Sequence, residues 1–264
     1  MAANLPNFEA PPINEVAMGV QFAPIEGLLH THFGLFWSLV KEEFSKSDEA
    51  APLGTAEGLW INQKTNVPLP RTWLVHDETQ CLIQLQPDIF YFNWRRQADD
   101  QNYPSYAEIK PLFYKYLWRY VDFLTGEKLL PPEQVKCDLT YVNIIPRGEG
   151  DEPVEFLAEL LPDVSWRLAK DRYLPLPKAL SWQATIEIEE AIELTANVNP
   201  AARKTDDHPV LRLQISARDT GPGSSLDATE PWFDRAHDAI VLSFIDLTSE
   251  RKQRELWKRT DAAS

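Results

Sequence analysis

Glycine is scarce in this chain, which has 10 glycines against 21 prolines in 264 residues. Loops that cradle phosphates need glycine, because only glycine lets the backbone approach the phosphate closely. The two G-x-G spacings, at 148–150 and 221–223, continue to no third glycine, and no glycine-rich run precedes a Lys-Ser or Lys-Thr pair. The sequence therefore excludes both the dinucleotide fingerprint and the P-loop.

Cysteine and long apolar runs are also rare. Cys81 and Cys137 are too few for a disulfide framework or a structural zinc site, and their apolar neighbours predict buried, reduced thiols. The longest apolar stretch, 33–40, is far shorter than the roughly 20 residues of a membrane helix. The first residues lack a basic region followed by an apolar one, as a secretory signal would have. We predict a cytoplasmic protein with no membrane segment.

Positive charge is in deficit, because 26 Lys and Arg stand against 40 Asp and Glu and leave a net charge of −14. DNA and RNA are polyanions, so this balance opposes nucleic-acid binding as the main activity. The same charge suits a basic protein partner. Aromatic residues make up 11% of the chain and include nine tryptophans, which are typical anchors of a protein interface or a homodimer.

The hydrophobic patterns predict an α+β fold. Alternation predicts strands in the first half, at 13–22, 72–76, 79–86, 89–96 and 135–145. Spacings of three and four residues predict helices at 25–44 and 103–124. The second half is mostly strand, at 164–168, 180–190, 193–199 and 210–217, followed by helices that begin after 230 and at an N-cap Thr248.

Short connections between the predicted strands favour mainly antiparallel sheets. The expected architecture has two long helices in the first half and C-terminal helices packing on a strand-rich second half. A loop at 147–153 divides the chain into two lobes, 1–146 and 154–264, unless the chain forms one continuous domain.

Polar residues interrupt two of the apolar strands. Asn93 and Arg95 share one face of the first, and Tyr141 and Asn143 share one face of the second. An unsatisfied buried polar group costs about 1–3 kcal/mol, so these side chains need partners. Two interpretations stay open: an internal hydrogen-bond network, or a concave site in which these four residues recognise an anionic or peptide-like group.

Histidines provide little evidence for catalysis. His237 follows Asp234 by three residues on a predicted helix, a spacing at which a carboxylate can orient an imidazole. No serine or cysteine with a nucleophile-elbow context accompanies the pair, so we assign no catalytic residue and keep His237 as a candidate for ligand or partner binding. On a helix, His30 and His32 diverge by about 200° and cannot share an ion. We predict no metal site and no cofactor.

Several motifs resemble one bacterial family. They are Pro11-Pro12-Ile13-Asn14-Glu15-Val16, Asn93-Trp94-Arg95, Tyr103-Pro104-Ser105-Tyr106, Leu139-Thr140-Tyr141-Val142-Asn143 and Phe233-Asp234-Arg235-Ala236-His237. The chain is similar over nearly its whole length to this sporadically distributed, functionally uncharacterised family of proteins of about the same length. The resemblance transfers no site residues. Patchy distribution is typical of horizontally moved genes, so it implies an antitoxin, immunity or phage-defence context.

The function predicted from the sequence is that of a non-enzymatic, acidic, cytoplasmic interaction protein, an accessory component of such a locus. Its expected partner is a protein, either basic or a second copy of the chain. The alternative is a small-ligand-binding protein or a hydrolase, with its site near the Asn93-Trp94-Arg95 strand.

Overall fold

The computed structural model describes residues 5–54, 61–62, 67–76, 81–98, 102–148, 150–167, 171–189, 191–203 and 206–260. The chain divides into two compact units that interleave along the sequence. The first comprises 1–14, 140–218 and 234–264, and the second comprises 15–139 and 219–233. The strands β2 (Ile13–Phe22) and β9 (Val135–Pro146) each have residues in both units. This division differs from the two sequential lobes expected from the sequence.

The second unit is built on an antiparallel sheet in which β2, β8, β7, β6 and β3 are hydrogen-bonded in that order. The further strands are β8 (Ile89–Arg95), β7 (Cys81–Gln86), β6 (Arg71–Val75) and β3 (Lys46–Ala50). The short strands β4 (Ile61–Asn62) and β5 (Val67–Pro68) pair with each other. The expected strands at 72–76 and 89–96 are present, and residues 79–80 of the expected strand 79–86 lie outside the described residues.

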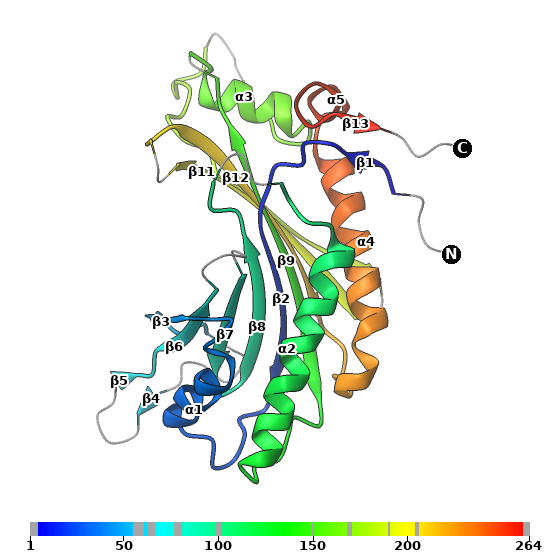
Figure 1. Ribbon diagram of the computed structural model, residues 1–264. Coiled ribbons are helices and arrows are strands. Elements are labelled where there is room, and N and C mark those ends of the chain that lie inside the picture. Colours follow the sequence, from blue (N-terminus) through cyan, green and yellow to red (C-terminus); the bar gives the residue numbers. More distant parts are fainter. Residues whose placement is uncertain are drawn as a thin grey trace. The chain divides into compact units, whose positions relative to one another are not determined.

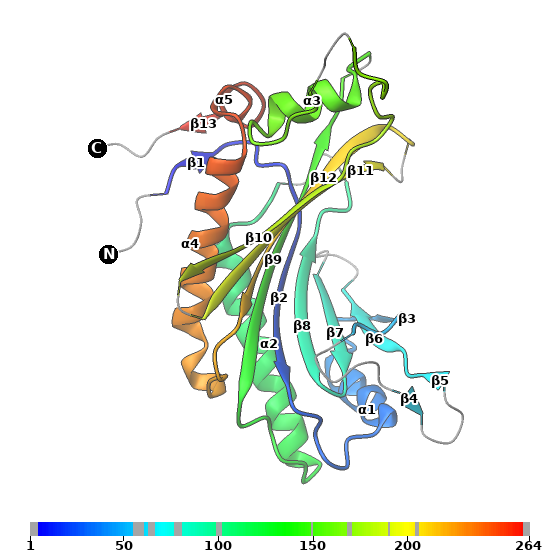
Figure 2. The same cartoon turned by 180° about the vertical axis from the view of Figure 1, so that it is seen from behind.

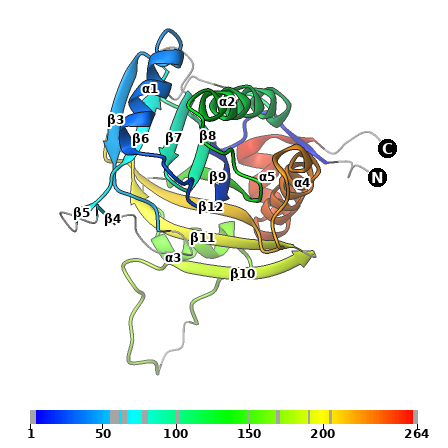
Figure 3. The same cartoon turned by 90° about the horizontal axis from the view of Figure 1, so that it is seen from below.

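Two helices cover one face of this sheet. They are α1 (His30–Val40) and α2 (Tyr106–Gly126), and Figure 3 shows them on the same side of β6, β7 and β8. Figure 1 shows α2 running alongside β8. Phe92 stacks on Tyr116 at a centroid distance of 5.6 Å, and Phe90 stacks on Tyr120 at 5.5 Å. Aromatic packing of this kind forms the main core of the unit.

Only one of these two helices is long. The spacing of apolar residues predicts a helix over 25–44, but α1 begins at His30 and has 11 residues. Gly27 has a φ of +80°, a left-handed conformation that turns the chain before the helix. By contrast, α2 has 21 residues and begins with a capping box, in which the backbone N–H of Ser105 donates to Glu108 Oε2 at 2.9 Å.

The first unit contains β10 (Trp182–Glu189), β11 (Ile192–Ala202), β12 (Pro209–Asp219) and β9, hydrogen-bonded in that order. Figure 2 shows β10, β11 and β12 side by side, and the β10–β11 pair is antiparallel. Two minor strands, β1 (Asn7–Phe8) and β13 (Arg259–Thr260), pair antiparallel. Residue 190, at the end of an expected strand, lies outside the described residues. The expected α+β class with antiparallel strands is confirmed.

Three helices belong wholly or mostly to the first unit: α3 (Pro153–Leu160), α4 (Glu230–Leu247) and α5 (Glu250–Trp257). The sequence patterns missed α3. No strand occurs at 164–167, where one was expected, and residue 168 lies outside the described residues. Ser249, not Thr248, caps α5, because its Oγ accepts the N–H of Lys252.

The cysteines are buried and unbonded, which confirms the expected reduced thiols. Burial raises the pKa of the Cys137 thiol, so this group is held in its neutral form. Among the helices of the described ranges, none has the length and apolar character needed to cross a membrane.

Candidate functional site

The sheet of the second unit has a polar face. Phe90 and Phe92 point toward the helices, so strand alternation places Tyr91, Asn93 and Arg95 on the opposite face. The strand registers add further polar side chains to it. The polar face comprises Glu15 and Gln21 of β2, Tyr91, Asn93 and Arg95 of β8, Gln84 and Gln86 of β7, and Arg71 and Trp73 of β6.

A relay of hydrogen bonds crosses the polar face. Trp73 Nε1 donates to Gln84 Oε1 at 3.1 Å, and Gln84 Nε2 donates to Asn93 Oδ1 at 2.6 Å. Asn93 Nδ2 in turn donates to Glu15 Oε1 at 2.5 Å. Gln84 and Asn93 are only 6% and 2% exposed, so the relay satisfies two buried amides while tying four strands together. For Asn93, these contacts fit the internal-network interpretation.

Arg95 has different surroundings, because it stacks on Trp73 together with Arg71. The guanidinium carbons of Arg95 and Arg71 lie 5.2 and 5.5 Å from the centroid of the Trp73 ring system. A guanidinium stacked on an aromatic ring keeps its N–H edges free for acceptors in its own plane. The Nε atoms of both arginines are buried, and neither has a hydrogen-bond partner within the described chain.

The charges of this arginine–tryptophan stack, defined as Arg71, Trp73 and Arg95, are not neutralised by a contact. In the described part of the chain, neither arginine forms an ion pair with a carboxylate. Burial lowers the pKa of Arg71, and the charges of Tyr91 and Glu15 oppose that shift. The stack is therefore a partly buried pair of cations with unused donors.

At Gln86, the polar face is closely packed. The backbone N–H of Leu53 donates to Gln86 Oε1 at 2.9 Å, and Gln86 Nε2 donates to the Leu53 carbonyl at 3.1 Å. The Tyr91 ring lies directly on Gly19, where a Cβ atom would come within 2.3 Å of it. These contacts close the face around Gln86, whereas Arg71, Trp73 and Arg95 each remain partly exposed.

The other three predicted site residues lie in the first unit. The Tyr141 hydroxyl is 3.0 Å from His237 Nδ1, and the two rings are 5.9 Å apart. Asn143, 2% exposed, donates its amide to the Leu213 carbonyl at 3.2 Å. Tyr141 thus orients the imidazole of α4, and Asn143 ties β9 to β12. The structure joins Tyr141 to His237 but gives Asn143 a separate, backbone partner.

A groove of about 420 Å³ follows α2 in the second unit. Its lining consists of Lys110, Pro111, Tyr114 and Trp118 of α2, with Leu226, Asp227 and Glu230. The last three come from the 3-10 helix Leu226–Ala228 and the first residue of α4. The Tyr114 hydroxyl is 2.9 Å from Thr229 Oγ1, and Lys110 Nζ is 2.8 Å from Glu230 Oε1, so contacts on both sides hold the walls together.

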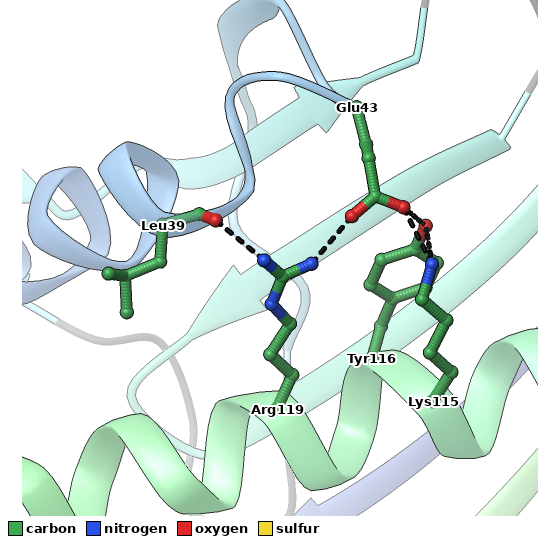
Figure 4. A network of polar contacts seen from close by, with 5 residues as sticks. All are labelled: Leu39, Glu43, Lys115, Tyr116 and Arg119. Atoms are coloured by element: carbon green, nitrogen blue, oxygen red, sulfur yellow. Dashed lines mark hydrogen bonds and ion pairs between the residues drawn. The ribbon is translucent and has the colours of Figure 1, made fainter.

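A second cluster of charges on α2 is fully paired (Figure 4). Glu43 accepts hydrogen bonds from Lys115 Nζ at 2.6 Å and from Tyr116 Oη and Arg119 Nη1, both at 2.5 Å. Arg119 also donates to the Leu39 carbonyl at 2.9 Å. The hydrogen bond from Lys115, followed by that from Tyr116, lowers the pKa of Glu43 to about 2. This network fastens the segment after α1 to α2, and its cations already have a carboxylate.

Sequence reasoning missed Arg71, Trp73 and Gln84 as neighbours of Arg95. The signal for Gln84 was present, since a glutamine inside the apolar run Cys-Leu-Ile-Gln-Leu-Gln needs a buried partner. No such signal marks Trp73, because its contact with Arg95 depends on strand register. The groove was missed because Tyr114 and Trp118 lie off the apolar stripe of α2.

Comparisons with known proteins add little. No protein-family model matches the chain, and a search among curated proteins gives no match. Among solved structures, the crystal structure of the di-domain ARO/CYC StfQ from the steffimycin biosynthetic pathway is similar with a TM-score of 0.24 and 12% identity. That match covers 88% of this chain and 96% of the other. A TM-score this low carries no argument, and the bacterial family resemblance stays a prediction.

Proposed function

We propose that this protein is a non-enzymatic interaction protein, and that its groove binds an extended, basic, proline-containing segment of a protein partner. The observation that supports this is the composition of the groove. Tyr114 and Trp118 offer aromatic surface beside Pro111, and the acidic residues Asp227 and Glu230 line the same space.

Aromatic grooves suit proline-rich segments, because these segments are already extended and lose little entropy on binding. Trp118 is half-buried, so part of its ring remains accessible. Its indole N–H has no hydrogen-bond partner within the described residues and is free to donate to a carbonyl of a bound segment. Tyr114 is held by Thr229, so that wall is ordered before any partner arrives.

Charge favours a basic partner. Lys110 is paired with Glu230, which leaves Asp227 as the acidic group in the lining that has no ion pair within the described residues. The net charge of −14 adds long-range attraction for a cation and repels acidic competitors.

The chain contains a segment of this chemistry, which supplies a probe. Residues 172–178 read Arg-Tyr-Leu-Pro-Leu-Pro-Lys, and Tyr173 is 96% exposed. A labelled peptide of residues 171–180 is titrated with the full-length protein while fluorescence anisotropy is recorded. We expect saturable binding that Trp118→Ala weakens by about tenfold or more and Asp227→Asn weakens several-fold.

Glu155→Gln, an exposed carboxylate change on α3, is the matched control and leaves binding unchanged. Equal binding of a peptide in which Arg172 and Lys178 are replaced by Glu contradicts the proposed charge preference. Absence of binding by this peptide and by a panel of other basic, proline-containing peptides contradicts the proposed function. The antitoxin, immunity or defence role stays a prediction.

A further inference from the structure

We infer that the arginine–tryptophan stack of the polar face is a binding site for a small anion of the carboxylate or phosphate class. This site is independent of the groove: it uses residues of β6 and β8, whereas the groove uses α2 and the segment at 226–230.

The two arginines have unused hydrogen-bond donors. A buried N–H of a charged group that lacks an acceptor costs at least as much as a neutral one. Arg71 and Arg95 both carry such an Nε within the described chain. An anion that accepts from the Nε–Nη edge of a guanidinium satisfies such a donor, since carboxylates and phosphates match this edge with two parallel hydrogen bonds.

The charge of the stack also favours an anion. Two partly buried guanidinium groups lie over one indole, and interactions of charges are stronger there than in bulk water. Glu15, the acidic residue of the polar face, already accepts from Asn93 and forms no ion pair with either arginine. A bound anion supplies the missing negative charge.

Several other basic residues of this chain have acceptors for their N–H groups. Lys115 and Arg119 of α2 contact the carboxylate of Glu43 directly. Arg172 also stacks on an indole, at 4.3 Å from Trp166, but its Nη1 donates to the Arg167 carbonyl at 2.6 Å. Arg172 therefore lies over a tryptophan with one donor that has an acceptor, whereas the Nε atoms of Arg71 and Arg95 have none within the described residues.

The surroundings are arranged to hold such a site. The relay through Gln84 fixes the Trp73 indole on which both arginines stack. Trp73, Arg71 and Arg95 are each partly exposed, so the stack borders on solvent although the two Nε atoms are buried. The site is therefore ordered before the anion binds.

The test is isothermal titration calorimetry on the full-length protein at low ionic strength. Inorganic phosphate and succinate are titrated separately, with sodium chloride of matched ionic strength as the blank. We expect one saturable site for at least one of the two anions. Binding of phosphate alone assigns the phosphate class, and binding of succinate alone assigns the carboxylate class.

Three variants test whether anion binding depends on the arginine–tryptophan stack. Arg95→Lys keeps the charge but removes the two-pronged edge, so affinity falls by about tenfold or more. Glu15→Gln removes the neighbouring negative charge and raises affinity several-fold, a gain that a folding defect cannot produce. Arg172→Lys, which removes the other stacked arginine, leaves affinity unchanged.

Two results overturn the inference. One is the absence of saturable heat for both anions in the unmodified protein. The other is binding that persists at full strength in the Arg71→Lys/Arg95→Lys double variant. The Trp118→Ala protein should bind the anion as the unmodified protein does, so failure of this inference and failure of the proposed function are distinguishable.

Discussion

The two faces of the sheet in the second unit are both largely buried, yet different interactions hold them. On the helix side, fully buried rings such as Phe92 pack against Tyr116 of α2, and nondirectional apolar burial supplies the stability. On the polar face, a directional relay joins Trp73, Gln84, Asn93 and Glu15. On the helix side, Arg119 donates to the Glu43 carboxylate. On the polar face, the buried Nε atoms of Arg71 and Arg95 have no hydrogen-bond partner within the described residues, and we place a ligand site there.

The largest loss of stability is expected for a substitution on the helix side of the sheet. Phe92→Ala removes a ring that is 0% exposed and stacked on Tyr116, so the free energy of unfolding should fall by about 3–5 kcal/mol. Urea unfolding followed by circular dichroism measures this loss. Phe92→Leu, which keeps most of the volume, should cost much less. A loss below about 1 kcal/mol for the alanine variant means that this face is not the main core.

The next largest loss of stability is expected when the hydrogen-bond relay is broken. Asn93→Ala leaves Gln84 Nε2 and the Glu15 carboxylate without their buried partner, at a cost of about 1–3 kcal/mol. The double variant Asn93→Ala/Gln84→Ala should cost clearly less than the sum of the single variants, because both act on one network. Strict additivity in urea unfolding contradicts a connected relay.

The Glu43 network on the helix side should make the free energy of unfolding depend on pH. The folded pKa of Glu43 is about 2 against an ordinary 4.5, so its contribution is fully present above about pH 4.5 and is lost as pH falls toward 2. Solvent screens the half-exposed cations Lys115 and Arg119, so this contribution is about 1 kcal/mol. Unfolding free energies measured from pH 7 to pH 2.5 should fall less steeply for Glu43→Gln than for the unmodified protein. If the free energy of unfolding falls equally steeply for both proteins between pH 4.5 and 2.5, Glu43 does not stabilise the fold in this way.

Much of the fold could be read from local pattern. Alternation along 13–22 predicted β2 at its observed bounds, and the three- and four-residue spacing after Tyr103 predicted α2 closely. The helix α3 was missed although Pro153 at its first turn and buried Val154, Leu157 and Leu160 carried the signal. Gly27 shortened α1, because a left-handed turn interrupts the apolar stripe.

The site was harder to predict, because it depends on pairing between strands. The sequence marks Asn93 and Arg95 as polar residues in an apolar strand, but it does not reveal that their roles differ. Asn93 joins the relay through Gln84, whereas Arg95 reaches Trp73 two strands away. Neither neighbour follows from spacing along the chain, since register alone brings β6, β7 and β8 together.

On the polar face, we infer that the relay holds the strands together and that Arg71 and Arg95 bind a ligand. The most direct measurement compares the free energy of unfolding of Arg95→Ala with that of Asn93→Ala, both without added anion. We predict that Arg95→Ala lies within about 1 kcal/mol of the unmodified protein, because it breaks no hydrogen bond and loses only part of a stacked contact. A loss as large as that of Asn93→Ala would contradict the account and make Arg95 a part of the framework.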